Sequence, residues 1–421
     1  MRLCERTNKI RFGLSVVVLA LLYVISVVYF DVSVDSWRSG RFTFTTKNTR
    51  SGPPDSSSGR TKSVLFYNDM FGHTDFYFGS GDVFENCSGI ARNCWATHDI
   101  STSIYDVEDF DAVLFHGSDP YMESVPAVRR DRQVYVFVNL ESPANRPISH
   151  TEFENGFFNL TMTYRLDSDL VWSYGDVREL NGGKFVAPKR DTAWPTTFRK
   201  STDPQDTKRS RGKETTDKRI TKTKTAIWLV SNCNGLSGRS KYIEELARHV
   251  DVDIFGLCGR STGCPKGNDR CFRQIVEPDY FFYLSFENSM CQDYVTEKLY
   301  NALTLNVVPV VYGGANYSRF APPNSYINAL DFDEPRALAE YLKRLTRQPD
   351  EYEKYFEWKK HYEIVDSKKR VICQLCDYLH KRHEPKSYTS LSAWYQNDKC
   401  PLQKELIDLS YLTGRDLQNQ R

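Results

Sequence analysis

The sequence predicts an α/β protein with two doubly wound, Rossmann-like domains behind an N-terminal transmembrane helix. Three observations support this prediction. An uncharged apolar segment occupies residues 12–30, short apolar runs of strand length recur from residue 64 onward, and from residue 226 such runs alternate with helical patterns. Strands that alternate with helices favour a parallel sheet covered by helices.

Residues 12–30 have the length and composition of a membrane-spanning helix. The segment holds 19 residues without a charge, and about 17–25 residues are needed to span a bilayer. Four basic residues and one acidic residue precede it, and Asp31 and Asp35 follow it. The positive-inside rule then predicts a cytosolic tail of residues 1–11 and a luminal remainder. The alternative is a cleaved signal peptide, whose apolar region is shorter and ends in small residues.

The cysteine count agrees with a luminal compartment. Of 11 cysteines, Cys4 falls in the predicted cytosolic tail, which leaves ten, an even number, for the oxidising lumen. Three sequons, at Asn86, Asn159 and Asn316, are candidate glycosylation sites. With 56 Lys and Arg against 54 Asp and Glu, the composition predicts no nucleic-acid partner.

A stem and a first domain follow the predicted anchor. Residues 31–62 are rich in Ser, Thr, Arg and Gly and lack apolar periodicity, which predicts a flexible stem. The first domain is predicted over residues 63–198. Its apolar runs at 64–67, 112–115 and 134–138 have the length of buried parallel strands.

A charged segment, residues 199–224, separates the first domain from the second. It holds ten Lys and Arg, four Asp and Glu and almost no apolar residues, which predicts a solvated linker; a basic site for an acidic partner is the alternative. The second domain is predicted over residues 225–385, and residues 386–421 are predicted as a C-terminal tail. Strands are expected at 226–230, 252–255, 280–286 and 307–312, with helices at 241–250 and 296–305.

Two polar segments stand where a predicted strand ends and a helix begins, which is where doubly wound domains bind ligands. Residues 231–239 (SNCNGLSGR) offer small residues, backbone amides and the guanidinium of Arg239, which suit a diphosphate. Residues 286–298 end with Thr296, a predicted helix cap, and Lys298. Because a lysine in the first helical turn opposes the helix dipole, Lys298 indicates an anion site; the alternative is a surface charge on an amphipathic helix.

These segments resemble those of a known family. Residues 283–289 (YLSFENS) and 293–303 (DYVTEKLYNAL) are similar to the signature of the α1,3-fucosyltransferases, glycosyltransferase family 10. The 231–239 segment is also similar to a family motif. In the first domain, the matching segments are 139–143 (NLESP) and 158–165 (FNLTMTYR).

The resemblance extends roughly over residues 62–380 and implies a fold and an activity. The fold is of the GT-B type, with an N-terminal acceptor-side domain and a C-terminal GDP-fucose-binding domain. The activity is the inverting transfer of L-fucose from GDP-fucose to O3 of N-acetylglucosamine (GlcNAc) in a glycoprotein or glycolipid glycan, at the Golgi membrane. Core and antennal GlcNAc both remain open as acceptors. The alternative is a type II membrane lectin-like protein or a catalytically inactive glycan-binding relative.

The resemblance also implies roles for individual residues. An inverting transfer needs a base that takes the proton of the acceptor hydroxyl. The matching base is Glu141, which follows the predicted strand at 134–138; the alternative is a structural carboxylate that caps the turn before Pro143. The residues that match donor-contacting positions are Asn232, Arg239, Asn288, Tyr294, Glu297, Lys298, Tyr164 and Arg165.

No metal or other cofactor is expected to be required. Asp-x-Asp triplets occur four times in the chain, which shows how unspecific the pattern is. The resemblance assigns the charge that a departing diphosphate needs to Arg239 and Lys298. GDP-fucose is then a co-substrate, and stimulation by Mn²⁺ or Mg²⁺ is compatible with this expectation.

Cys373 and Cys376, with two histidines close behind, have the residue types of a zinc site. The spacing is too short for a C2H2 finger, however, and the lumen favours oxidation. The resemblance implies instead that the two cysteines form separate disulfides to Cys87 and Cys94. The other luminal cysteines, which can pair in 15 ways, are Cys233, Cys258, Cys264, Cys271, Cys291 and Cys400.

Overall fold

The computed structural model describes residues 61–99, 106–119, 124–148, 150–195, 221–261 and 269–400. These belong to one compact unit, Ser51–Arg421. The predicted cytosolic tail and transmembrane anchor, almost all of the stem and the linker, and the end of the C-terminal tail lie outside the described residues. Within the described ranges, no helix is both long and apolar enough to cross a membrane.

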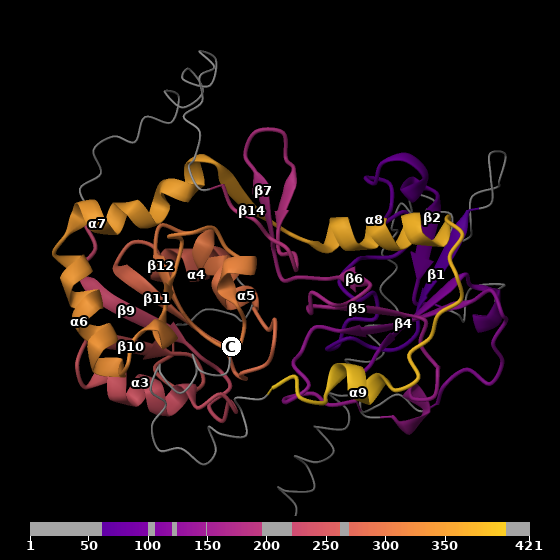
Figure 1. The fold of residues 1–421 in the computed structure, drawn as a ribbon, viewed down its shortest axis with the longest axis horizontal. Helices are drawn as coiled ribbons and strands as arrows, with labels where there is room; N and C mark the ends of the chain where they lie inside the picture. Colours follow the sequence, from indigo (N-terminus) through magenta and orange to yellow (C-terminus); the bar gives the residue numbers. More distant parts are fainter. Residues whose placement is uncertain are drawn as a thin grey trace, which may run out of the picture. The chain divides into compact units, whose positions relative to one another are not determined.

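The first domain is built on a parallel sheet with the strand order β2-β1-β3-β4-β5-β6 (Figure 1). Its strands are β1 (Lys62–Phe66), β2 (Cys94–Thr97), β3 (Ala112–His116), β4 (Val134–Asn139), β5 (Leu160–Thr163) and β6 (Leu170–Val171). The three apolar runs of the sequence coincide with β1, β3 and β4. Every residue of β3 is buried, because both faces of a parallel sheet are covered.

The second domain has a parallel sheet with the order β10-β9-β11-β12-β13. Its strands are β9 (Lys224–Leu229), β10 (Val252–Phe255), β11 (Tyr280–Phe286), β12 (Val308–Tyr312) and β13 (Ile327–Asn328). Its helices are α3 (Arg239–Ala247), α4 (Asp269–Val276), α5 (Glu297–Leu303), α6 (Pro335–Thr346) and α7 (Pro349–Glu353). The four predicted strands and both predicted helices are present, so the two Rossmann-like sheets confirm the predicted fold class at this level.

A third sheet was not expected from the sequence. Its strands run antiparallel in the order β14-β7-β8. They are β7 (Asp176–Glu179), β8 (Phe185–Ala187) and β14 (Tyr362–Val365). The short 3-10 helices are η1 (Gly89–Arg92), η2 (Val107–Asp109), η3 (Thr151–Phe153), η4 (Tyr317–Arg319), η5 (Ala329–Asp331) and η6 (Lys354–Lys360). Because β14 pairs with β7, with Tyr362 opposite Glu179 and Val365 opposite Asp176, this sheet joins the end of the first domain to the end of the second.

The chain returns to the first domain after the third sheet. Helix α8 (Lys368–Leu379) lies against the first sheet (Figure 1). It buries Val371, Ile372 and Leu375 in the same core as Val64. The predicted second domain, residues 225–385, is therefore too long at its C-terminal end. The physical reason is the apolar face of α8. This face must be buried against other apolar residues, and the core of the first sheet provides them.

Two disulfides link α8 covalently to the first domain. Cys373 and Cys376 lie one turn apart on α8 and bond to Cys87 and Cys94 respectively, as the resemblance implies. Because both sulfurs are oxidised, they do not offer the thiolates of the zinc alternative. The ring of His380 bonds to the Asn93 carbonyl at 2.9 Å, and His383 stacks on Tyr378. The further described pairs are Cys233–Cys258 and Cys291–Cys400, and Cys271 is also disulfide-bonded.

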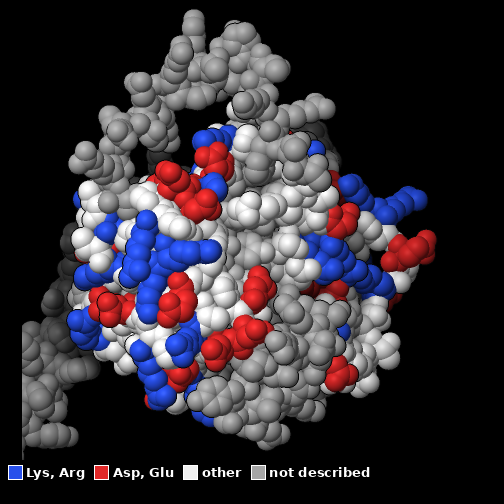
Figure 2. Space-filling model, turned by 60° about the vertical axis from the view of Figure 1, so that its left-hand side comes forward, with Lys and Arg blue, Asp and Glu red and all other residues white. Residues whose placement is uncertain are grey.

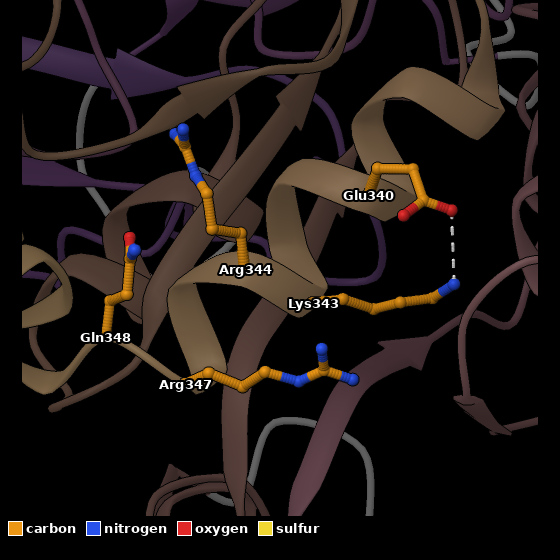
Figure 3. Close-up of a pocket in the computed structure, with 5 residues that line it drawn as sticks. All are labelled: Glu340, Lys343, Arg344, Arg347 and Gln348. Atoms are coloured by element: carbon orange, nitrogen blue, oxygen red, sulfur yellow. Dashed lines mark hydrogen bonds and ion pairs between the residues drawn. The ribbon is translucent and has the colours of Figure 1, made fainter.

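Charged side chains of both signs are interspersed on the face that Figure 2 presents. A surface pocket lies at the end of α6, lined by Glu340, Lys343, Arg344, Arg347 and Gln348 (Figure 3). Lys343 pairs with Glu340 at 3.3 Å, and Arg344 lies over the ring of Tyr341. Cations in the last turn of a helix are stabilised by its dipole, which accounts for the basic residues that line this pocket.

Candidate active site

The first part of the site lies at the carboxyl end of β4. The strand ends at Asn139, and Glu141 follows two residues later. The Asn139 side chain donates to Ser118 Oγ at 2.5 Å and accepts the backbone N–H of Glu141 at 3.0 Å. Asn139 is fully buried, so it fixes the turn that presents Glu141.

The carboxylate of Glu141 is held through one oxygen. Its Oε1 accepts hydrogen bonds from the Ser142 N–H at 3.0 Å, from Asn145 Nδ2 at 3.3 Å and from the hydroxyl of Tyr294. No described residue donates to Oε2. The Ser142 bond is the turn-capping role that the sequence offered as an alternative, but it uses only one of the two oxygens. The other oxygen is available to a substrate hydroxyl.

Tyr294 brings the second domain to this carboxylate. Its ring is buried and packs edge-on against Tyr164, with centroids 5.0 Å apart. Close by, Ser289 Oγ and Ser142 Oγ bond at 2.7 Å. The segment that precedes α5 in the second domain therefore meets the segment that follows β4 in the first, at Glu141.

The second part of the site lies at the start of α5. Thr296 caps the helix, and its N–H and hydroxyl both donate to Glu287, at 2.8 Å and 2.9–3.0 Å. The Lys298 ammonium lies 3.1 Å from Glu287 Oε2 and 3.3 Å from Glu297 Oε1. Glu287 is fully buried whereas Glu297 is exposed. Lys298 thus lies between one buried and one exposed carboxylate.

The electrostatics of this cluster keep Lys298 charged. Burial lowers the pKa of Lys298, but the neighbouring carboxylates of Glu287 and Glu297 outweigh that effect and raise it above its ordinary value. Burial raises the pKa of Glu287, while Lys298 opposes this effect. A protonated Lys298 at neutral pH is the form that attracts an anion such as a diphosphate.

The loop after β9 is hydrogen-bonded to the segment that follows β11. Ser237 Oγ donates to the Glu287 carbonyl at 2.6 Å, and the Ser237 N–H donates to the Asn288 carbonyl at 3.0 Å. A Cβ at Gly235 would lie 3.0 Å from Arg239 Nε and 3.3 Å from Asn288 Cα, so only glycine fits without displacement. Arg239 Nε and Asn288 Oδ1 are both buried without a hydrogen-bond partner among the described residues. Buried polar atoms without a partner call for an explanation, and a ligand or water bound at this loop would provide one.

Comparison with known proteins decides the family of this site. A family model described as glycosyltransferase family 10 (fucosyltransferase), C-terminal, matches residues 220–394, and one described as fucosyltransferase, N-terminal, matches residues 59–175. The chain is 40% identical over 308 residues to α-(1,3)-fucosyltransferase C of Drosophila melanogaster, covering 71% of this chain and 68% of that protein. This chain belongs to glycosyltransferase family 10.

Other fucosyltransferases are similar as well. A 4-galactosyl-N-acetylglucosaminide 3-α-L-fucosyltransferase of Homo sapiens is 33% identical over 313 residues, covering 72% of this chain and 73% of the human protein. A solved α1,3-fucosyltransferase structure with GDP-fucose matches at 16% identity and a TM-score of 0.40, covering 86% of this chain and 96% of that one. As a family 10 member, the protein is a glycosyltransferase, as the motifs indicated.

The predicted site residues of this fucosyltransferase fall into two groups. Glu141 and Tyr294 touch directly, and Asn288 and Lys298 lie in the segment from the end of β11 to the start of α5. Asn232 and Glu297 are exposed beside these elements. The structure thus brings most of the predicted residues to the strand ends and helix starts where the sequence placed them.

Arg239, predicted as a donor-binding residue, makes its described hydrogen bonds to backbone carbonyls of the protein. Its guanidinium is buried and donates to the carbonyls of Phe286 at 2.7 Å and Asn232 at 2.8 Å. Burial lowers its pKa from its ordinary value. Two of its nitrogens therefore hold the loop, and donor binding by Arg239 stays a prediction.

Arg165 is also placed differently from a donor contact. It is completely buried, it pairs with Asp167, and its Nη1 donates to the Trp394 carbonyl at 2.7 Å. Its neighbour Tyr164 is buried against Tyr294, and its hydroxyl has no hydrogen-bond partner in the described part of the chain. Donor contact by these two residues stays a prediction, and the geometry of Arg165 supports a role in anchoring the C-terminal segment.

Sequence reasoning missed two residues of the site. Glu287 was part of the motif but received no role, although an acid between a buried strand and a capped helix start could have indicated a partner for Lys298. Tyr395, in the segment predicted as a tail, donates its hydroxyl to the backbone carbonyl of Glu141. Nothing local in the sequence marks this contact.

The three sequons lie in different surroundings. Asn86 and Asn316 are exposed. The side-chain nitrogen of Asn159, by contrast, donates to the Lys386 carbonyl at 2.9 Å, and its oxygen accepts the Tyr135 N–H at 2.8 Å. A glycan on Asn159 would have to fit on a nitrogen that lies 2.9 Å from the Lys386 carbonyl, so the exposed sequons fit glycosylation better. All three stay predictions.

Proposed function

We propose that this fucosyltransferase is of the GT-B type and transfers L-fucose from GDP-fucose to O3 of a GlcNAc residue, with inversion and with Glu141 as the base. The observation that carries the proposal is the Glu141 carboxylate, which has one anchored and one free oxygen where the two domains meet. The names of the Drosophila and human relatives support fucose as the transferred sugar and the 3-position as the site of transfer.

The proposed chemistry is a single displacement. Glu141 Oε2 accepts the proton of the acceptor hydroxyl as that oxygen bonds to C1 of fucose, while the bond from C1 to the phosphate oxygen breaks and GDP leaves with the electron pair. Positive charge must stabilise the departing diphosphate. The protonated Lys298 and the buried charge of Arg239 are our candidates for that role.

The proposal is tested by incubating the chain without its predicted anchor with GDP-fucose and a panel of acceptors. The panel contains N-acetyllactosamine, an N-glycan core and the same glycans without a free O3 on GlcNAc. We expect an α1,3-fucosylated product from at least one acceptor with a free O3. Glycan binding without turnover of GDP-fucose would instead support a lectin-like or inactive protein.

We expect transfer to continue in excess EDTA. Each Asp-x-Asp triplet has an aspartate that is already bonded within the protein: Asp111 to Lys62, Asp167 to Arg165, Asp253 to Lys224 and Asp331 to Asn328. Among the described residues, the one cluster with metal-ligand spacing is Cys94, Cys376 and His380, and its two sulfurs form a disulfide. Rates measured with EDTA, Mn²⁺ and Mg²⁺ check this. Complete loss in EDTA that only Mn²⁺ restores would contradict it.

We also propose that the enzyme is a single-pass type II protein of the Golgi membrane with its catalytic part in the lumen. The uncharged segment at 12–30, with its basic N-terminal flank, supports this topology. In intact microsomes, a tag at the C-terminus should resist protease until detergent is added. Digestion of the tag without detergent would show the opposite orientation.

A further inference from the structure

Two tyrosines from outside the first sheet bond to the same residue, Glu141. The hydroxyl of Tyr294 donates to the carboxylate oxygen Oε1, and the hydroxyl of Tyr395 donates to the backbone carbonyl. Both rings are buried, at 1% and 0% exposure. One tyrosine therefore fixes the side chain of Glu141 and the other fixes its backbone.

Tyr395 is held in place by the C-terminal strap, which we define as residues 388–400. Within the strap, α9 (Leu391–Tyr395) has its first N–H groups bound by Glu154, at 2.8 Å each. Arg165 donates to the Trp394 carbonyl at 2.7 Å, and the Tyr395 ring packs edge-on against Phe137 of β4. The strap is thus anchored to the first domain by partly buried, charge-assisted hydrogen bonds.

Tyr294 is held by the other end of the same strap. Cys291, three residues before Tyr294, forms a disulfide with Cys400. Beside it, the Gln292 N–H donates to the Lys399 carbonyl at 2.7 Å, and Asp293 accepts the Leu166 N–H at 3.2 Å. The strap therefore runs from one tyrosine that touches Glu141 to a covalent link beside the other.

We propose that Tyr294 and the C-terminal strap form one positioning assembly for Glu141, closed by the Cys291–Cys400 disulfide. The assembly anchors Oε1 so that Oε2 stays aimed at the acceptor hydroxyl. This inference rests on the proposed role of Glu141 as the base and gives Tyr294 a role other than donor contact.

The protonation state of Tyr294 fits this role. Burial, together with Tyr174 and Glu141, raises the pKa of Tyr294 well above its ordinary value. Its hydroxyl is therefore protonated throughout the neutral range and remains a hydrogen-bond donor to the carboxylate. Because misplacement of a reacting group by about 1 Å can cost roughly 10²-fold in rate, loss of this donor has a measurable effect.

The test uses Tyr294→Phe and Tyr395→Phe, which keep the rings and remove only the hydroxyls. We expect kcat to fall roughly 10–100-fold in Tyr294→Phe and less in Tyr395→Phe, while KM for GDP-fucose changes less than about twofold. Tyr352→Phe is the matched control, because this buried tyrosine donates to the Phe281 carbonyl at 2.7 Å, away from Glu141. The control should keep the wild-type rate.

A double-variant cycle separates positioning from a general structural effect. If Tyr294 acts through Glu141, adding Tyr294→Phe to Glu141→Gln should produce no further loss, because residues that act as a unit are not additive. Multiplicative losses would overturn the proposal. A raised KM for GDP-fucose with an unchanged kcat would overturn it as well, and would make Tyr294 a donor contact.

The disulfide is tested with Cys291→Ser/Cys400→Ser, which should lower kcat in the same direction as Tyr294→Phe and add nothing to it when combined. Thermal unfolding and GDP calorimetry on every variant identify any that misfold. A wild-type rate in Tyr294→Phe, in an enzyme that loses activity with Glu141→Gln, would overturn this inference and leave the proposed function standing. Full activity of Glu141→Gln would overturn the proposed function itself.

Discussion

Replacing Glu141 with Gln is expected to slow fucose transfer by roughly 10²–10⁴-fold, the usual contribution of general-base catalysis. The geometry allows this substitution to remove the basic group and keep the hydrogen bonds around it. The amide oxygen of Gln can take the place of Oε1 and accept the same bonds from Ser142, Asn145 and Tyr294, while an NH₂ group that accepts no proton replaces Oε2. GDP should still bind with near wild-type affinity, measured by calorimetry.

Glu152→Gln is the matched control for this experiment, because Glu152 is an exposed carboxylate of the same domain. Its rate should equal that of the wild type. If Glu141→Gln remains within a few-fold of the wild type, the base lies elsewhere, and Glu297 is the next candidate. If Glu141→Gln loses affinity for GDP instead, then Glu141 serves the donor and the proposed division of labour between the domains is wrong.

Replacing Lys298 with Met is expected to have two effects that a second substitution can separate. It leaves the carboxylate of Glu287 buried without its cation, and breaking a buried ion pair in this way typically costs about 3–5 kcal/mol of stability. It also removes a charge from the proposed diphosphate site. Charge-assisted hydrogen bonds contribute about 1.5–3 kcal/mol, so we expect GDP affinity to fall roughly 10–100-fold.

The double variant Lys298→Met/Glu287→Gln should recover stability but not GDP affinity. An amide at residue 287 is neutral and can still accept the Thr296 bonds. Unfolding midpoints and calorimetry with GDP measure the two effects. Lys343→Met is the control, because that lysine pairs with the exposed Glu340 at the surface (Figure 3), and exposed pairs contribute little. Recovery of both properties in the double variant would show that Lys298 is only structural.

Local features of the sequence predicted the two sheets and much of the site. A strand buried on both faces must be apolar along its length, so the runs that became β1, β3, β4, β9, β11 and β12 were visible directly. The edge strand β10 is only partly buried and carries Asp253 between Val252 and Ile254, as a half-buried strand does. The helix cap at Thr296 and the positions of Glu141, Asn288 and Lys298 at strand ends and helix starts also follow from short segments. These features are local because each depends on neighbours within a few residues.

The tertiary structure decided which of these residues meet. Tyr294 and Tyr395 lie 153 and 254 residues from Glu141 in the sequence, and no periodicity or spacing pairs groups so far apart. The return of α8 and the strap to the first domain, and the choice of Cys400 as the partner of Cys291, likewise depend on long-range packing. The sequence by itself determined the fold class and the chemical groups of the site. Packing between distant segments decided that the hydroxyl of Tyr294 meets the Glu141 carboxylate and that Tyr395 meets its backbone carbonyl.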